Sequence, residues 1–192
     1  DNNVPDWYIE SCQRIKYMFP RAHAVAYVMM SYRIAWFKVY YPVPFYAAYF
    51  TTKVADFNSE VVLKGSGAIL ARIDEILAKG KNATKKEEDE MTVLEVAYEM
   101  YSRGYEFEPI NFGVSDGTKF YEHEGRVLLP FMAVSGIGET AAKALADECR
   151  IRPFETIEEL KSRTRISNSN IESLKAMGVL EGMPETDQLS MF

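Results

Sequence analysis

The sequence predicts a mainly α protein with a small β-hairpin element, that is, a fold of the α+β class. Three observations favour it: a proline-free, helix-compatible run over residues 22–41, a capping box at Thr84-Lys85-Lys86-Glu87, and a change to short β-prone pieces over residues 105–129. With 192 residues, 47% of them hydrophobic, the chain can bury one substantial core or two small ones.

The first predicted element is a long, mostly buried helix from Ala22 to Tyr41, which Pro42 and Pro44 end. The run is apolar enough to raise the question of a membrane span, but Arg33 and Lys38 lie inside it. Each charge near the centre of a span costs about 2.5 to 3.5 kcal/mol, so a buried or amphipathic helix is the better interpretation and no membrane partner is expected.

A second helix is expected to begin near residues 56–59, where Asp56 and Ser59 are candidate N-caps, and to run to Gly80. The capping box then starts a third helix, which Gly104 closes. The charged run over residues 85–90 is interpreted as the solvated first turn of this helix.

Residues 105–129 predict a small hairpin or meander around Asp116-Gly117 and Glu124-Gly125, and this is the expected domain boundary. Three short helical units should follow Pro130: one after Gly138, one capped by Thr156 with Glu159, and one capped by Ser169 with Glu172 that ends at Gly178. Beyond Gly182 and Pro184 an exposed tail is expected.

Charge and cysteine content restrict the function classes. The net charge of −6 is uneven: residues 1–53 carry +3, residues 54–125 carry −7 and residues 126–192 carry −2. An anion site is therefore expected near the start or in local clusters. Cys12 and Cys149 lie far apart with no nearby ligand, which indicates neither a zinc site nor a disulfide and favours a reducing cytoplasm. No signal peptide is recognised at the start of the sequence, and its first residue is Asp1, so we expect either a processed product or, as we favour, a piece cut from something longer.

The tightest local motif is Val134-Ser135-Gly136-Ile137-Gly138-Glu139-Thr140-Ala141-Ala142-Lys143-Ala144. Two glycines allow a close backbone turn, and the helix that follows offers unpaired amides and a positive dipole end to a phosphate. Lys143 would add charge one turn further on. The pattern resembles the hairpin of a helix-hairpin-helix module, which holds a nucleic-acid backbone without reading bases. The alternative is a plain glycine turn between helices.

A possible second hairpin, over residues 164–170, lacks paired glycines and would be a degenerate member of a pair. The cations around it could form a phosphate-facing patch, although a solvated face explains them equally well. They are Arg150, Arg152, Lys161, Arg163 and Arg165.

Two further segments suggest binding. Residues 16–27 place Lys16, Tyr17, Arg21 and His23 ahead of the predicted long helix, in the only net-positive region, where they could neutralise a triphosphate and stack on a base; the alternative is a structural histidine. The chain ends in Gln188-Leu189-Ser190-Met191-Phe192, whose exposed apolar groups gain nothing unless a partner buries them or the tail folds back.

No catalytic centre is predicted. Only two histidines occur, no Walker loop is present, and no aspartate pair lies in an apolar β context as two-metal phosphoryl transfer would require.

Taken in order, these segments look like the end of the bacterial DNA polymerase III alpha subunit of the PolC type, found in low-GC Gram-positive bacteria. Residues 4–12 and 16–37 look like the last part of its fingers, residues 107–143 are similar to its duplex-binding region, and residues 188–192 resemble its terminal clamp-binding peptide.

The resemblance implies a division into residues 1–53 (end of the fingers), 54–104 (helical fingers or linker region), 105–182 (helix-hairpin-helix duplex-binding domain) and 183–192 (clamp-binding tail). It implies nucleotide binding by Tyr17, Arg21 and His23, with Arg21 standing where the family often has lysine. It implies DNA binding by the set Ser135, Gly136, Gly138, Thr140 and Lys143, and binding of the sliding clamp (beta subunit) by Gln188, Leu189, Ser190, Met191 and Phe192, where Met191 replaces a commoner leucine.

The expected function is therefore that of a fragment of a replicative DNA-directed DNA polymerase, with double-stranded primer-template DNA, an incoming dNTP and the clamp as partners. The fragment itself is expected to bind no cofactor and to be inactive alone, because the resemblance places Mg²⁺ and its aspartates in a palm that this sequence lacks. Two rivals stay open: a non-catalytic repair or recombination scaffold with the same module and peptide, and a purely structural helical protein.

Overall fold

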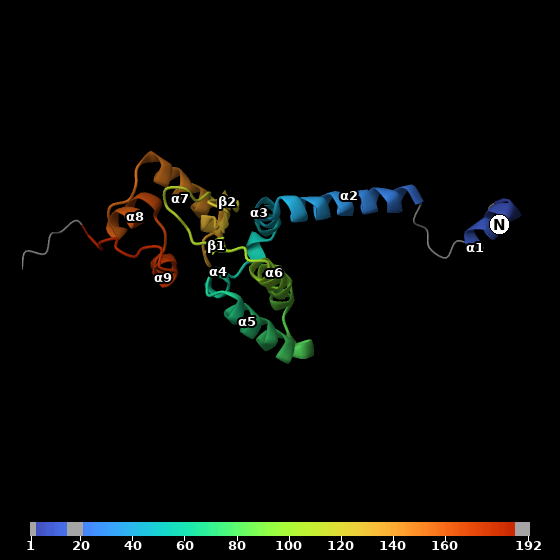
Figure 1. Ribbon diagram of the computed structural model, residues 1–192, viewed down its shortest axis with the longest axis horizontal. Helices are drawn as coiled ribbons and strands as arrows, with labels where there is room; N and C mark the ends of the chain where they lie inside the picture. The colour runs from blue at the N-terminus through green and yellow to red at the C-terminus, as the bar shows by residue number, and fades with distance from the viewer. Residues whose placement is uncertain (1–2, 15–20, 187–192) are drawn as a thin grey trace, which may run out of the picture. The chain divides into compact units, whose positions relative to one another are not determined.

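The computed structural model describes residues 3–14 and 21–186 and divides the chain into two units, residues 1–40 and 41–192 (Figure 1). The first unit contains α1 (Asp6–Arg14) and α2 (Arg21–Tyr40). The long helix is thus confirmed, with its end one residue before the predicted one. No helix in the described parts of the chain is both long enough and apolar enough to cross a bilayer.

The prediction that α2 is mostly buried is wrong. Tyr27 is 63% exposed, Tyr32 is 75% exposed and Trp36 is 42% exposed. Apolar side chains point to all sides of this helix, a pattern typical of a helix that protein surrounds. An apolar pattern on all sides of a helix predicts that the helix is covered, and the covering residues can belong to this chain or to another part of a larger assembly.

The second unit opens with α3 (Pro42–Thr52), a helix that was not predicted. Pro42 and Pro44 do follow the end of α2, but they occupy the first turn of a new helix, where a missing amide N–H and a fixed φ are tolerated. Tyr46 and Phe50 of α3 are fully buried. Phe50 lies within 6 Å, centroid to centroid, of the rings of Phe57, Phe107 and Phe120, so α3 supplies the centre of an aromatic core.

The helix predicted from residue 56 to Gly80 is two helices. The 3-10 helix η1 (Val54–Asp56) precedes α4 (Ser59–Val62), whose N-cap is Asn58, and α5 (Ser66–Ala78) follows. Helix α4 ends at Val62 with Leu63 as its C-cap, and Gly65, whose φ of +89° is one that glycine adopts at low cost, is the N-cap of α5. A 3-10 turn, η2 (Gly80–Asn82), leads on to the next helix.

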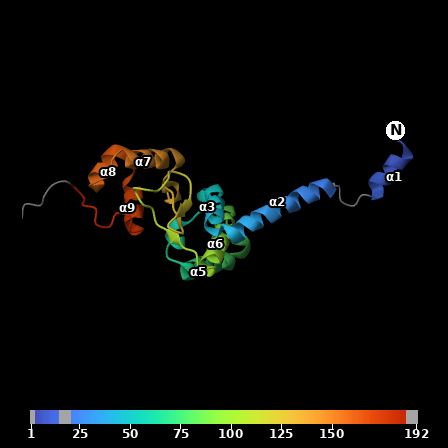
Figure 2. The same cartoon turned by 45° about the horizontal axis from the view of Figure 1, so that its top comes forward.

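The capping box predicted at Thr84 is confirmed at the start of α6 (Lys85–Ser102). The Thr84 hydroxyl accepts from the amide of Glu87 at 3.3 Å, and the Glu87 carboxylate accepts from the amide of Thr84 at 2.9 Å. Helices α5 and α6 pack side by side in both views (Figures 1 and 2). Gly104, with a φ of +83°, closes α6 as expected.

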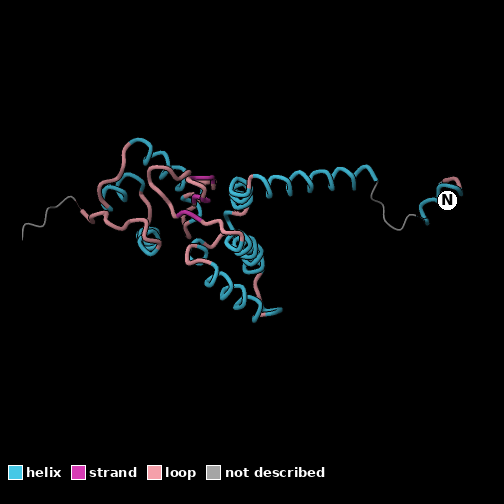
Figure 3. The backbone as a smooth tube through the Cα atoms, in the orientation of Figure 1, coloured by secondary structure: helices cyan, strands magenta, loops and turns pink. Residues whose placement is uncertain are grey.

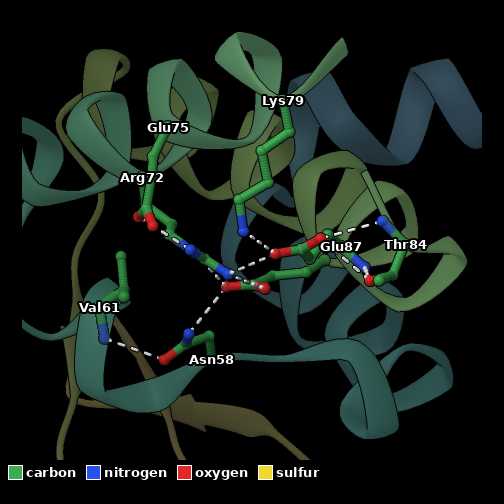
Figure 4. Close-up of polar contacts among 8 residues, drawn as sticks. Asn58, Val61, Arg72, Glu75, Lys79, Thr84 and Glu87 are labelled. Atoms are coloured by element: carbon green, nitrogen blue, oxygen red, sulfur yellow. Dashed lines mark hydrogen bonds and ion pairs between the residues drawn. The ribbon is translucent and has the colours of Figure 1, made fainter. Parts of the chain in front are cut away.

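The charged run at the start of α6 is only partly solvated. Glu90 is 8% exposed and accepts hydrogen bonds from Arg72 Nε at 3.1 Å, from Arg72 Nη2 at 3.0 Å and from Asn58 Nδ2 at 2.8 Å. Lys79 donates to Glu87 in the same network, whose side chains point toward one another in Figure 4. The network joins Asn58, the N-cap of α4, to helices α5 and α6. The charge pattern alone could not predict this role.

A three-stranded sheet follows, whose strands are magenta in Figure 3, and its strand order is β1-β3-β2. Strands β2 (Tyr121–His123) and β3 (Arg126–Leu128) are antiparallel, and β1 (Phe107–Glu108) pairs with β3 in parallel. The predicted hairpin turn at Glu124-Gly125 is confirmed, with φ of +49° and +78°. The sequence Asp116-Gly117 makes no strand turn; the Asp116 carboxylate instead accepts from the amides of Thr118 and Lys119.

Candidate nucleic-acid interface

The predicted hairpin over residues 134–138 joins a 3-10 helix, η3 (Phe131–Ala133), to α7 (Glu139–Ile151). Gly136 has a φ of +82°, which only glycine adopts at low cost, and Gly138 is the N-cap of α7. Ile137 between them is buried and its amide donates to Val134 O at 3.1 Å. The buried Ile137 therefore anchors the turn in the core, while the exposed Gly136 and Gly138 leave its outer surface free of side chains.

The predicted DNA-binding residues lie together at the start of α7. Ser135, Gly136, Gly138 and Thr140 are all exposed, and Lys143 follows one turn further along the helix. Because Gly138 has no side chain, it makes no cap hydrogen bond to the first-turn amides, and these amides remain available to an anion. An exposed turn with unpaired amides at the positive end of a helix is suited to a phosphate oxygen.

Lys143 is not a bare cation. Its Nζ lies 2.6 Å from Glu139 Oε1, and both side chains are more than half exposed. The hydrogen bond to Glu139 raises the pKa of Lys143, because it stabilises the charged ammonium. Such an exposed pair contributes little to stability, so a phosphate can compete for the lysine at small cost.

A loop that the sequence did not connect to this region packs against α7. A Cβ on Gly117 would lie 2.9 Å from the Cα of Lys143 and 3.0 Å from the carbonyl oxygen of Ala142, so only glycine fits there. The loop and the helix enclose a cleft of about 520 Å³ that Lys119, Lys143 and Arg150 line together with carboxylates. In the sequence, only Gly117 indicates this contact between the loop and α7, and the pattern Asp116-Gly117 predicts no more than a turn.

The predicted second hairpin has the same backbone plan as the first. Arg165 has a φ of +55°, Ile166 is buried, and Ser167 is the N-cap of α9 (Asn168–Ala176), in the same order as Gly136, Ile137 and Gly138. The cap predicted at Ser169 with Glu172 is wrong, because the capping box is formed two residues earlier by Ser167 with Asn170. In this capping box Asn170 takes the place that glutamate or glutamine usually has. A sequence pattern that requires glutamate at that position therefore does not identify it.

The helix between the hairpins, α8 (Ile157–Thr164), starts at the predicted cap Thr156, whose hydroxyl accepts from Glu159 N at 3.0 Å. Arg163 of this helix donates to Glu148 O at 2.7 Å and stacks over the ring of Phe154 at 4.4 Å. Arg152 pairs with Glu159. Arg163, whose side chain is only 17% exposed, joins α7 to α8, so the interpretation of the basic cluster as one phosphate-facing patch does not apply to it.

The expected nucleotide-binding and clamp-binding residues are less fully described. Tyr17 and Gln188–Phe192 lie outside the described residues. Arg21 is the first residue of α2, and the rings of His23 and Tyr27 are 4.4 Å apart in an edge contact. Nucleotide binding and clamp binding therefore stay predictions.

The chain leading to the terminal peptide is held to the fold. The carbonyl oxygens of Pro184 and Glu185 accept from the amides of Ile157 and Glu158 at 3.0 Å each, which caps the start of α8. Lys175 pairs with Glu185 at 2.7 Å. Residues 184–186 are exposed, as expected for a tail, but their backbone is hydrogen-bonded as far as Glu185.

Comparison with known families identifies the class of protein module to which these hairpins belong. A family described as "Helix-hairpin-helix motif" matches residues 104–189, which confirms the module predicted from the glycine hairpin. The match spans both hairpins and the small sheet.

The whole chain is, in turn, similar to PolC-type DNA polymerase III, and the predicted resemblance is confirmed. It is 53% identical over 191 residues to that of Caldanaerobacter subterraneus subsp. tengcongensis, 48% over 193 residues to that of Clostridium perfringens, and 47% over 191 residues to that of Halalkalibacterium halodurans. Each alignment covers 100% of this chain but only 14%, 13% and 13% of the respective relative, so the chain spans about one seventh of their length.

Proposed function

We propose that this chain is a DNA-binding segment of a replicative DNA-directed DNA polymerase of the PolC type, and that it grips the duplex through the hairpin at Gly136–Gly138. The observation that carries the proposal is the uncapped start of α7, where exposed amides follow a glycine turn. The similarity to PolC-type polymerases along the full chain favours a polymerase over a repair scaffold or a structural protein. Phosphate contacts of this kind hold a backbone without reading sequence.

The test is duplex binding by the full 192-residue chain and by a Gly138→Asp, Lys143→Glu variant. Aspartate is a good N-cap, and a Cβ at Gly138 meets no atom within 4 Å, so the variant should fold while its carboxylate occupies the phosphate position. We expect at least about tenfold weaker binding at low salt, and a log–log salt dependence shallower by about one unit.

The matched control is Gly67→Asp, Lys81→Glu, which makes the same changes in charge at exposed positions outside the matched segment. Its binding should stay within about twofold of the parent chain, since its substitutions do not touch the hairpin. Equal affinities of the hairpin variant and the parent would refute the proposal.

In the intact polymerase we propose that Tyr17, Arg21 and His23 contact the incoming nucleotide. The support is the resemblance together with the position of Arg21 and His23 at the start of a long helix. A His23→Ala polymerase should show a raised KM for dNTP, whereas His123→Ala, which changes the other histidine of this sequence, should not. Unchanged steady-state kinetics for His23→Ala would remove this role.

Mg²⁺ is proposed to act at carboxylates elsewhere in the intact polymerase. Among the residues that the structure describes, no three His, Cys, Asp or Glu side chains are grouped so that they could hold a metal ion. Within a cytoplasmic replication complex, the contribution of this chain would then be to hold DNA and partners.

A further inference from the structure

The two hairpins are linked by one buried side chain, that of Asn170. It lies in the first turn of α9 and is only 8% exposed. Its Nδ2 donates to the carbonyl oxygen of Ser135 at 3.3 Å, in the first hairpin. Its Oδ1 accepts from the hydroxyl of Ser167 at 2.6 Å and from the amide of Ser167 at 3.4 Å, in the second hairpin.

The orientation of the Asn170 amide is fixed by its partners. The amide of Ser167 can only donate, so the atom that faces it must be the oxygen. The carbonyl of Ser135 can only accept, so the atom that faces it must be the nitrogen. Both contacts require the same orientation, and no rotation of the amide satisfies them otherwise.

The first hairpin is shaped to receive this side chain. A Cβ at Gly136 would lie 3.0 Å from Asn170 Nδ2, in addition to the strain of its φ of +82°. The glycine therefore serves two purposes: it makes the turn, and it leaves room for the amide that holds the turn. Ser135, directly before it, is exposed and keeps its side chain available while its carbonyl is bound.

We infer that Asn170 is a positioning residue for the DNA contact, which holds the backbone of the first hairpin in the shape that presents the amides of α7. The inference rests on the proposed function of the Gly136–Gly138 hairpin, and it assigns a role in that function to a residue outside the hairpin. Asn170 itself touches no DNA in this role; it acts through Ser135 and Gly136.

The test compares Asn170→Asp with Asn168→Asp in the full chain. Aspartate is nearly isosteric with asparagine, still accepts from Ser167 and suits the first turn of a helix, but it cannot donate to Ser135 O. Asn168→Asp adds the same charge two residues away, at an exposed position. We expect duplex binding to weaken about five- to tenfold for Asn170→Asp relative to Asn168→Asp, as for the loss of one hydrogen bond.

A second measurement separates positioning from a loss of folding. In ¹⁵N–¹H NMR spectra, the amide peaks of Gly136 and Gly138 should shift in Asn170→Asp and stay in place in Asn168→Asp, while the two variants unfold at similar temperatures. If Asn170→Asp does not fold, the parent chain still decides: the side-chain amide protons of Asn170 should exchange with solvent more slowly than those of Asn168.

The outcomes are distinct. Equal duplex affinity of the two aspartate variants, unshifted glycine peaks, or equally fast exchange at Asn168 and Asn170 would overturn the role of Asn170. Failure of the parent chain to bind duplex at low salt would instead overturn the proposed function, while the glycine peaks would still report whether Asn170 holds the hairpin.

Discussion

His123 is a single residue whose charge ties two strands together. Its Nδ1 lies 2.7 Å from Glu108 Oε2, so the pair joins β2 to β1 across the central strand. The hydrogen bond to Glu108 raises the pKa of His123 above its ordinary value. The folded state therefore binds this proton more tightly than the unfolded state does.

This linkage predicts a pH-dependent contribution to stability. Because the folded pKa of His123 is raised, the contribution is fully present below the unfolded pKa and is lost as pH rises through the folded pKa. We expect His123→Gln to lower the free energy of unfolding at pH 5.5, with the difference from the parent shrinking at pH 8.5. Denaturant titrations at both pH values measure it, with His23→Gln as the control. A difference that is the same at both pH values would contradict the prediction.

Single residues also mark where sequence analysis succeeds. Gly136, Gly138 and Lys143 were identified because glycines before a helix have a direct physical meaning. Asn170 and Gly117 were not, because their roles depend on partners 35 and 26 positions away, at Ser135 and Lys143. No local pattern encodes such a contact.

At the scale of elements, a partly buried ion pair between Arg72 and Glu90 connects α5 to α6. Burial raises the pKa of Glu90, but hydrogen bonds from Arg72 and Asn58 outweigh it and leave the pKa below its ordinary value. The carboxylate is therefore ionised and depends on Arg72, whose side chain is 22% exposed.

Arg72→Met should destabilise the fold by about 3 kcal/mol, since it leaves a buried carboxylate without its main partner. Urea unfolding measures this. Arg126→Met is the control, because Arg126 pairs with Glu106 on the surface and its loss should cost less than about 0.5 kcal/mol. Arg72→Met, Glu90→Met should recover much of the loss; no recovery would show that packing of Arg72, rather than its charge, is what matters.

Elements with local start signals were predictable and elements set by tertiary contacts were not. The caps at Thr84 and Thr156 and the turn at Glu124-Gly125 are made by neighbouring residues, and all three are confirmed. Helix α3 was missed because its prolines were interpreted only as an end, and the break at Gly65 was missed because the apolar spacing continues across it. The parallel pairing of β1 with β3 depends on a long-range contact.

At the scale of the whole molecule, we predict that the chain binds a bacterial sliding clamp through residues 188–192. Calorimetry of the full chain with the clamp should give a binding signal that deletion of these five residues abolishes, since Leu189, Met191 and Phe192 would fill an apolar pocket. Ser190→Ala should bind normally and serves as the control. Equal heats with and without the peptide would contradict the prediction.

The hydrogen bonds from Ile157 and Glu158 to the carbonyls of Pro184 and Glu185 set the reach of that peptide. Only two residues separate Glu185 from Gln188, and three fully extended steps of chain span at most about 10 Å. A sliding clamp bound there would lie close to α8 for as long as those two hydrogen bonds persist. If they broke, the length of chain between α8 and the clamp would increase, so the spacing of the two depends on hydrogen bonds at the start of one helix.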